Sequence, residues 1–264
     1  MSLRPDEPRR PAAPLARIGA PLTLSARLRS DVVFRLLADL TDARSFMEVG
    51  CGQGGLAVLL ARRYDYRGYE PDERSCRVAG QRLESRGLGG TVLNGVPPDT
   101  PDRTFDVVGA FEVLEHLADD RAALASWTRW VRPGGHLLLS VPAHPDRFGA
   151  ADRYVGHFRR YTREALTRLL DEAGLVEARI VSYGFPLGYA LEWGRNAILG
   201  RRETQGPHLK DARSRASGRT LQPGDAWAPF VWAAALPFQY AQRPFGRGEL
   251  GTGYVVRARV GGEL

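Results

Sequence analysis

The stretch FMEVGCGQGG, residues 46–55, most constrains how this 264-residue chain can fold. An apolar strand ends in Glu48 and runs directly into a glycine turn. Gly50 and Gly52 let the backbone turn sharply there and approach a ligand closely. A helix follows, and the unpaired N–H groups of its first turn can face that ligand. Because Gly50, Gly52 and Gly55 also satisfy the dinucleotide pattern G-x-G-x-x-G, the turn predicts a ligand without identifying it.

Strand and helix patterns alternate along the chain after residue 45, which predicts a parallel sheet covered by helices on both faces. Strands are expected at residues 45–50, 66–70, 91–94, 105–110, 136–142, 176–183 and 254–260. Helices are expected at residues 54–63, 73–85 and 119–131, the last of them ended by the run Arg132-Pro133-Gly134-Gly135. Thr162 can cap a further helix that stops before Gly174.

Two regions of the chain do not follow the alternation of strands and helices. Residues 1–25 are rich in Pro, Arg and Ala and predict a disordered or lid-like arm before one domain at 26–264. The last two strands are about 70 residues apart, too far for a plain loop, so residues 184–250 predict a helical insert or cap with a mobile middle. Its aromatic side chains can shape a pocket for a sizeable apolar substrate, pack as core, or contact lipid as a peripheral membrane surface. They are Trp193, Trp227, Phe230 and Trp232.

Charge is unevenly distributed. Segments 1–30 and 195–248 together carry +10, which exceeds the net charge of +7 and leaves the remainder at −3. Lys210 is the only lysine among 37 basic residues, a bias typical of a GC-rich bacterial genome rather than of selection for phosphate contacts. Nucleic-acid binding is therefore disfavoured.

Cysteine usage and apolar runs bear on location. Cys51 and Cys76 are too few for a disulfide framework or a zinc site, and the first residues lack the apolar core of a signal peptide. No apolar run is long enough to span a membrane, because Pro229 and Pro237 interrupt the longest one. We therefore expect a cytoplasmic protein. Its oligomeric state is not indicated.

Two carboxylates flank the glycine turn. Glu70 lies twenty residues after Gly50 at the end of the next strand, the position of an acid that hydrogen-bonds ribose hydroxyls. Glu48 would repel a pyrophosphate at the turn but attract a cationic sulfonium amino acid, which favours S-adenosylmethionine over NAD. The alternative is a pair of solvated acids at strand ends.

Four stretches in order carry a family resemblance: EVGCGQG, GYEPD, FDVVGAFEVLEHL and VRPGGHLLLSVP. Over residues 45–174 the chain resembles the class I S-adenosylmethionine-dependent methyltransferases, of the small-molecule type. The resemblance implies a Rossmann-like α/β fold: a doubly wound, mostly parallel seven-stranded sheet with an antiparallel last strand and a helical insert before it. It also implies S-adenosyl-L-methionine as cofactor.

The resemblance further implies a set of cofactor-binding residues. They are Glu48, Gly50 and Gly52 near the methionine part, Glu70 with Pro71 at the ribose, Asn94 and Gly95 beside the adenine, and Phe111 and Glu112 lining the cofactor. Asn94 departs from the family pattern, in which an acid is frequent in that loop. The next acid here is Asp99.

Methyl transfer from a sulfonium is an in-line displacement that needs positioning, sometimes a base, and no metal. We therefore expect O- or N-methylation of an unidentified, small-molecule acceptor. His116 and His157 are the candidate catalytic bases, because each follows a strand and can have a near-neutral pKa. The alternative for His116 is a local hydrogen bond at a helix start.

Arg159, Arg160 and Tyr161 are candidate substrate-binding residues, since arginine pairs bidentately with carboxylates and phosphates. They can equally pair with acids such as Asp152 and hold the loop. Rival functions are a non-catalytic S-adenosylmethionine-binding protein, an NAD-dependent enzyme, and a methyltransferase of a lipid or nucleic acid. A nucleobase-amine methyltransferase is disfavoured, because the chain has Ala110, Phe111 and Glu112 where a Pro-Pro-aromatic turn is usual.

Overall fold

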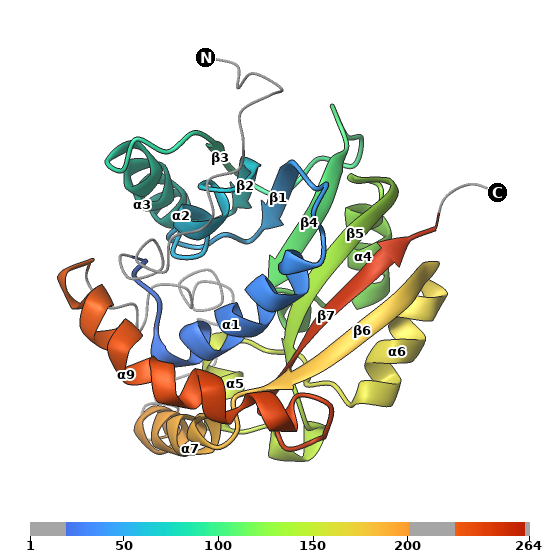
Figure 1. The fold of residues 1–264 in the computed structure, drawn as a ribbon. Helices are drawn as coiled ribbons and strands as arrows, with labels where there is room; N and C mark the ends of the chain where they lie inside the picture. The colour runs from blue at the N-terminus through green and yellow to red at the C-terminus, as the bar shows by residue number, and fades with distance from the viewer. Residues whose placement is uncertain (1–19, 201–224, 262–264) are drawn as a thin grey trace.

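The computed structural model describes residues 20–200 and 225–261, and its central feature is a seven-stranded sheet (Figure 1). The strand order is β3-β2-β1-β4-β5-β7-β6. β7 runs antiparallel to both of its neighbours, whereas the first five strands are parallel. The predicted Rossmann-like fold is thus confirmed. The strands are β1 Ser45–Val49, β2 Asp65–Glu70, β3 Thr91–Asn94, β4 Phe105–Phe111, β5 Val131–Pro142, β6 Leu175–Tyr183 and β7 Gly253–Val260.

Helices cover both faces of the sheet (Figure 1). One hydrophobic cluster joins α1, α2 and α3 to one face, and a second joins α4 and α6 to the other. This two-faced cover explains why the central strands read as nearly continuous apolar runs. The helices are α1 Leu24–Ala38, α2 Ala57–Leu60, α3 Glu73–Glu84, α4 Asp120–Thr128, α5 Ala150–Val155, α6 Arg163–Glu172, α7 Leu187–Gly200 and α9 Ala228–Ala241.

Side-chain caps start four of these helices. Thr23, Asp72, Asp119 and Thr162 each accept a hydrogen bond from the backbone N–H three residues ahead, which satisfies one of the free donors of the first turn. The cap at Thr162 is the one that the sequence predicts. The helix it begins ends at Glu172, before Gly174 with its positive φ of 70°.

The expected boundary between α4 and β5 is wrong. The helix ends at Thr128, and the strand begins at Val131 rather than at His136. The register of β5 against β4 shifts between Phe105 and Val107, so the Pro-Gly-Gly run lies in an irregular strand instead of a loop. A bulge accommodates the extra residues while the pairing continues on both sides of it.

In the described parts of the insert between β6 and β7, the two apolar stretches form the helices α7 and α9, as expected. α9 lies along α1 (Figure 1), where Gln239 and Gln242 donate side-chain hydrogen bonds to the carbonyl oxygens of Arg27 and Leu28 at 2.9 and 3.0 Å. The insert is thereby fixed to the first helix of the domain. Residues 1–19 of the arm predicted at 1–25, and the middle of the insert at 201–224, lie outside the described residues, whereas Leu24 and Ser25 already belong to α1.

Among the described residues, no helix is both long and apolar enough to cross a membrane.

We predict that Trp130→Ala lowers the free energy of unfolding by about 3 to 5 kcal/mol, measured by urea denaturation. Trp130 is fully buried, its ring lies 5.8 Å from that of Tyr69 and 6.3 Å from that of Phe105, and its Nε1 donates to the carbonyl of Pro98. The control is Trp193→Ala, because Trp193 is 76% exposed and its removal should cost less than about 0.5 kcal/mol. Equal losses in the two variants would contradict the assignment of Trp130 to the core.

Candidate functional site

A cavity of about 900 Å³ opens at the carboxyl ends of β1, β2 and β4. The strand order reverses between β1 and β4, and open α/β sheets bind ligands at such a point. Residues from many parts of the chain line the cavity, among them the start of α1, the glycine turn, the end of β2, the segments after β3 and β4, the loop after α5, and α7. The cavity therefore joins the predicted cofactor site to residues far away in sequence.

The glycine turn has the geometry that the sequence predicts. Gly50 and Gly52 have positive φ angles of 68° and 56°, which L side chains rarely adopt. A Cβ atom on Gly50 would also lie 2.7 Å from Cγ2 of Val113, whereas a Cβ on Gly52 would meet nothing within 4 Å. The turn is thus closed on the side of Val113 and open at Gly52, where it lines the cavity.

Glu70 is anchored at the floor of the cavity by backbone donors. Its two carboxylate oxygens accept hydrogen bonds from the N–H groups of Gly52 and Asp72, at 2.8 and 2.9 Å. Burial raises the pKa of Glu70, and the same backbone donors oppose that rise. Each carboxylate oxygen keeps a free lone pair, so the side chain can still accept hydrogen bonds from ligand hydroxyls.

Glu48 lies beside the turn and is only 3% exposed. Its Oε2 accepts a hydrogen bond of 2.7 Å from the hydroxyl of Tyr66. Burial raises the pKa of Glu48 to about 7, although Tyr66 and Arg29 oppose the rise. Burial thus favours the neutral form of Glu48, so the charge argument drawn from the sequence is weaker than it would be for an exposed carboxylate.

The upper wall of the cavity combines Glu112 with two side chains that the sequence analysis missed. Arg29 of α1 lies 3.5 Å from Oε1 of Glu112, and the Tyr183 hydroxyl donates to the same oxygen at 3.2 Å. Burial opposes ionisation of Glu112, but Arg29 and the hydrogen bonds from Ser140 and Tyr183 lower its pKa. The sequence signal at Arg29 is only the excess of positive charge in residues 1–30.

Glu112 also has a positive φ of 58°, a strained conformation for a side chain of this size. Ser140 holds this backbone, because its carbonyl and its hydroxyl both accept from the N–H of Glu112, at 3.0 and 3.1 Å. Phe111, the residue before, is buried and lines the cavity. The predicted pair Phe111 and Glu112 therefore does border the candidate site.

The residues expected near the ribose and the adenine do not all line the cavity. Pro71 and Gly95 line the cavity, and so does Asp99. Asn94 is not among the lining residues; its Nδ2 donates to the carbonyl oxygens of Glu70 and Pro71, at 3.0 and 3.4 Å. Asn94 thus positions the backbone of the β2 loop. Contact with the cofactor by Asn94 stays a prediction.

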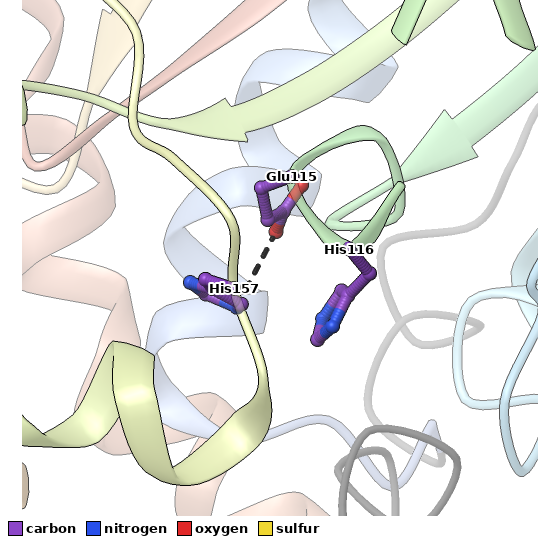
Figure 2. A group of neighbouring side chains, drawn as sticks. All are labelled: Glu115, His116 and His157. Carbon is purple, nitrogen blue, oxygen red and sulfur yellow. Dashed lines mark ion pairs between the residues drawn. The ribbon is translucent and has the colours of Figure 1, made fainter. Parts of the chain in front are cut away.

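The two candidate bases, 41 positions apart in the sequence, meet at the far wall of the cavity (Figure 2). The ring centroids of His116 and His157 are 4.5 Å apart, with the rings nearly perpendicular. Burial and the neighbouring His157 lower the pKa of His116 to about 4, which keeps it neutral. Glu115 lies beside the two rings and is completely buried, and burial together with nearby Glu112 raises its pKa.

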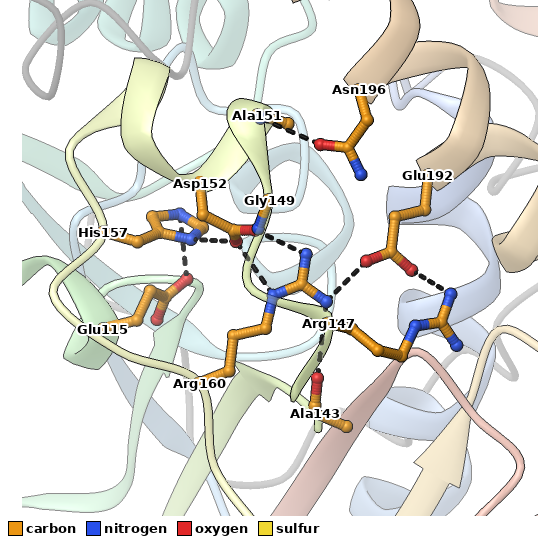
Figure 3. A network of polar contacts seen from close by, with 10 residues as sticks. All are labelled: Glu115, Ala143, Arg147, Gly149, Ala151, Asp152, His157, Arg160, Glu192 and Asn196. Carbon is orange, nitrogen blue, oxygen red and sulfur yellow. Dashed lines mark hydrogen bonds and ion pairs between the residues drawn. The ribbon is translucent and has the colours of Figure 1, made fainter. Parts of the chain in front are cut away.

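A buried ion-pair network supports this wall from behind (Figure 3). Asp152 accepts from Nδ1 of His157 at 2.8 Å and from two nitrogens of Arg160 at 3.0 and 2.6 Å. Arg160 also pairs with Glu192 of α7 at 2.5 Å, and Glu192 pairs with Arg147 at 2.6 Å. Burial by itself would raise the pKa of Asp152, but the hydrogen bonds from His157 and Arg160 hold that pKa well below its usual range.

The three predicted substrate-binding residues are mostly engaged within the protein. Arg160 pairs with Asp152, the alternative that the sequence analysis left open. Arg159 and Tyr161 both contact Oδ2 of Asp120, at 2.8 and 3.0 Å. Of the three only Arg160 lines the cavity. Direct acceptor binding by these residues stays a prediction, and their observed contacts hold the loop after α5.

The aromatic residues of the insert do not form the expected pocket wall or core. Trp193, Trp227 and Phe230 are 76%, 65% and 68% exposed, and none of them lines the cavity. The insert contributes instead Leu191 and Val231, together with the charged side chains of Glu192 and Arg195. Contact of these exposed side chains with lipid, the third interpretation drawn from the sequence, stays a prediction. Helical periodicity alone does not reveal which face of α7 and α9 points outward.

Comparisons with known proteins agree on the fold and the family. A family model described as a methyltransferase domain matches residues 23–177. A probable S-adenosylmethionine-dependent methyltransferase of Mycolicibacterium smegmatis is 33% identical over 151 residues, which cover 55% of this chain and 57% of that protein. A ubiquinone biosynthesis O-methyltransferase of Alkalilimnicola ehrlichii is 32% identical over 118 residues, 43% of this chain and 47% of the relative.

Similarity in structure extends further along the chain than similarity in sequence. The crystal structure of a possible histamine N-methyltransferase of Thermotoga maritima matches with a TM-score of 0.52 and 20% identity, over 93% of this chain and 92% of that one. At this identity the match establishes the fold alone. The chain spans about half the length of the curated relatives that it matches.

We predict that Arg160→Leu lowers the free energy of unfolding by about 3 to 5 kcal/mol, because Asp152 and Glu192 would stay buried without their shared cation. Arg159→Leu is the matched control: its partly exposed pair with Asp120 should be worth less than about 1 kcal/mol. Guanidinium denaturation of both variants measures the difference. If the two variants lost similar amounts of unfolding free energy, the buried network would contribute no more to stability than a partly exposed ion pair.

Proposed function

Since the chain belongs to the methyltransferase domain family, we propose that it transfers a methyl group from S-adenosylmethionine to an oxygen or nitrogen atom of a small molecule. One observation carries the proposal: a single cavity extends from the glycine turn and Glu70 at one end to His116 and His157 at the other. A two-substrate transfer needs such a continuous space, because donor and acceptor must meet in line within it.

The cofactor end of the cavity fits a nucleoside joined to an amino acid. The two oxygens of Glu70 are held in place by backbone donors and can accept from ribose hydroxyls. The open side of Gly52 leaves room for close approach of the ligand to the backbone. Glu48, with Glu112 further along the wall, provides negative charge for the cationic methionine part.

The acceptor end is the wall formed by His116 and His157. Nδ1 of His157 is engaged with Asp152, so Nε2 of the same ring is the nitrogen that faces Glu115 and His116. When bound, the cofactor supplies an electrophilic methyl group on a sulfonium. The chain's own residues then have to orient the acceptor, exclude water and provide the electron pairs that draw a proton from it.

Polarity at this wall favours a polar acceptor head over a purely apolar one. Arg29, Glu112 and Tyr183 are all within hydrogen-bonding or ion-pair distance of one another at the cavity surface. A small-molecule acceptor with hydroxyl or amino groups can exchange bonds with them. The O-methyltransferase and phosphoethanolamine N-methyltransferases among the relatives are consistent with such acceptors.

We also propose a cytoplasmic location in a bacterium. Cys51 and Cys76, the only cysteines of the chain, are both free, as is usual in a reducing compartment. The relatives in Mycolicibacterium and Alkalilimnicola support a bacterial origin.

The proposal predicts micromolar or tighter binding of S-adenosylmethionine and S-adenosylhomocysteine by titration calorimetry, with no binding of NAD. Glu70→Ala should weaken both about ten- to hundredfold, because it removes a charge-assisted hydrogen bond of roughly 1.5 to 3 kcal/mol. Glu73→Ala is the matched control, because the Glu73 side chain is 79% exposed and pairs only with Arg77 on the same helix.

Two results would contradict this proposal. Binding of NAD without S-adenosylmethionine would overturn the cofactor, and equal affinities in the Glu70 and Glu73 variants would overturn the role of Glu70. Release of S-adenosylhomocysteine from a screen of hydroxyl and amine acceptors separates an enzyme from a protein that only binds the cofactor.

Glu48 generates a pH prediction. With its pKa raised to about 7, Glu48 becomes fully negative only above neutral pH, so the cationic cofactor should bind more tightly as the pH rises. The dissociation constant should fall by up to about tenfold between pH 6 and pH 8, since the ionised fraction rises by that factor across the pKa. Glu48→Gln should flatten this dependence, and the same slope in both proteins would reject the role of Glu48.

A further inference from the structure

Glu115 is a buried carboxylate that no arginine pairs with among the described residues, and its only ion-pair contact there is with His157 at 3.8 Å. It is completely buried, and neither of its two oxygens has a hydrogen-bond partner among the described residues. An ionised carboxylate in such a place costs several kcal/mol unless a cation accompanies it. Two arginines of the same cavity, Arg29 and Arg160, are engaged with Glu112 and with Asp152. The charge of Glu115 therefore has to be neutralised, either by a proton within this cluster or by a bound cation.

Two imidazoles complete a set of metal-binding groups around this carboxylate (Figure 2). One ligand atom each from Glu115, His116 and His157 lies within 4.8 Å of the other two, and Nε2 of His157 is 3.8 Å from Oε1 of Glu115. Ligand atoms around a tetrahedral zinc ion are about 3.3 Å apart, so each side chain would have to move inward by less than about 1 Å.

His157 already has the orientation of a metal ligand (Figure 3). Its Nδ1 donates to Asp152, and a histidine that binds a metal through one nitrogen commonly donates to a carboxylate from the other. Asp152 is in turn held by Arg160 and by the N–H of Gly149, at 2.8 Å for the latter. The rigid partner on one side of the ring leaves Nε2 directed at the cluster on the other.

We propose that Glu115, His116 and His157 bind one divalent transition-metal ion, of which Zn²⁺ is the best match. Two imidazoles and one carboxylate form a set that binds zinc in catalytic sites, with a further position left open, whereas Mg²⁺ prefers oxygen ligands alone. The open position faces the cavity, because His116 and His157 line it. This inference differs from the metal-free reaction that the sequence predicts.

The role of this ion rests on the proposed function and narrows it. A hydroxyl oxygen of the acceptor that occupies the open position would lose its proton to water more readily, because the ion stabilises the resulting oxyanion. The oxyanion then attacks the methyl carbon: the O–C bond forms, the S–C bond breaks, and S-adenosylhomocysteine leaves with the electron pair on sulfur. The site thus favours a hydroxyl acceptor over an amine.

The test uses the full chain, stripped of metal with a chelator and titrated with Zn²⁺ by calorimetry and with Co²⁺ by visible absorbance. We expect one Zn²⁺ per chain, with d–d bands of four- or five-coordinate Co²⁺. Glu115→Gln and His157→Gln should each weaken binding by at least about tenfold, and Asp152→Asn by about ten- to hundredfold. His136→Gln is the control, because His136 on β5 is not among the residues lining the cavity.

Glu115→Gln supplies a second, independent measurement. Without metal this variant should melt at the same or a higher temperature than the natural protein, because it removes the buried charge, yet Zn²⁺ should no longer raise its melting temperature. Absence of Zn²⁺ binding below millimolar concentrations, or equal binding by the Glu115, His157 and His136 variants, would overturn the proposal in favour of a protonated Glu115. S-adenosylmethionine binding by the metal-free protein, measured in parallel, separates failure of the metal site from failure of the proposed function.

Discussion

The constraint on which the molecule depends is the reversal of strand order between β1 and β4. Because these parallel strands end at the same edge and their connections leave to opposite sides, the segments that follow them diverge and leave a space. Gly50 and Gly52 follow the first strand, and Glu112, Glu115 and His116 follow the other. The proposed donor and acceptor halves of the cavity are therefore consequences of one feature of the sheet.

The acceptor half needs additional support, because its polar groups are buried. Asp152 has no exposed surface, so its charge must be matched locally, and Arg160 provides the match in a bidentate pair. The same carboxylate fixes the ring of His157. Glu192 extends the network to α7, so the insert is held against the catalytic domain by charge as well as by apolar contacts. The orientation of the cavity wall thus depends on a helix that follows it in the sequence by about 35 residues.

The sheet and the cofactor half could be predicted because the information they need is local. Alternating apolar strands and caps such as Thr162 act within a few residues, and the glycine turn lies in one continuous stretch. The spacing from Gly50 to Glu70 follows from one βαβ unit. The start of β5 could not be predicted, because a bulge against β4 overrides the local preference of Pro and Gly for loops.

The acceptor half depends on contacts between distant segments, which one sequence does not reveal. His116 and His157 could be proposed separately, yet their meeting, and the burial of Glu115 beside them, follow from the path of the chain after β4 and α5. Arg29 comes from α1, more than 80 residues before its partner Glu112. The exposure of Trp193 on α7 likewise depends on a distant contact. Glu192 of the same helix pairs with Arg160, and this pairing leaves Trp193 on the outward face.

Electrostatics links the two halves of the cavity. Glu112 and Glu115 are three residues apart, and the negative charge of Glu112 raises the pKa of Glu115. Arg29 offsets part of that repulsion by pairing with Glu112, and it also lowers the pKa of Glu48 at the cofactor end. A positive charge that enters near Glu48 therefore competes with Arg29 for the same carboxylates. Because α1 carries Arg29 and is fixed to α9 through Gln239 and Gln242, this competition extends from the cofactor end to the insert that covers the acceptor end.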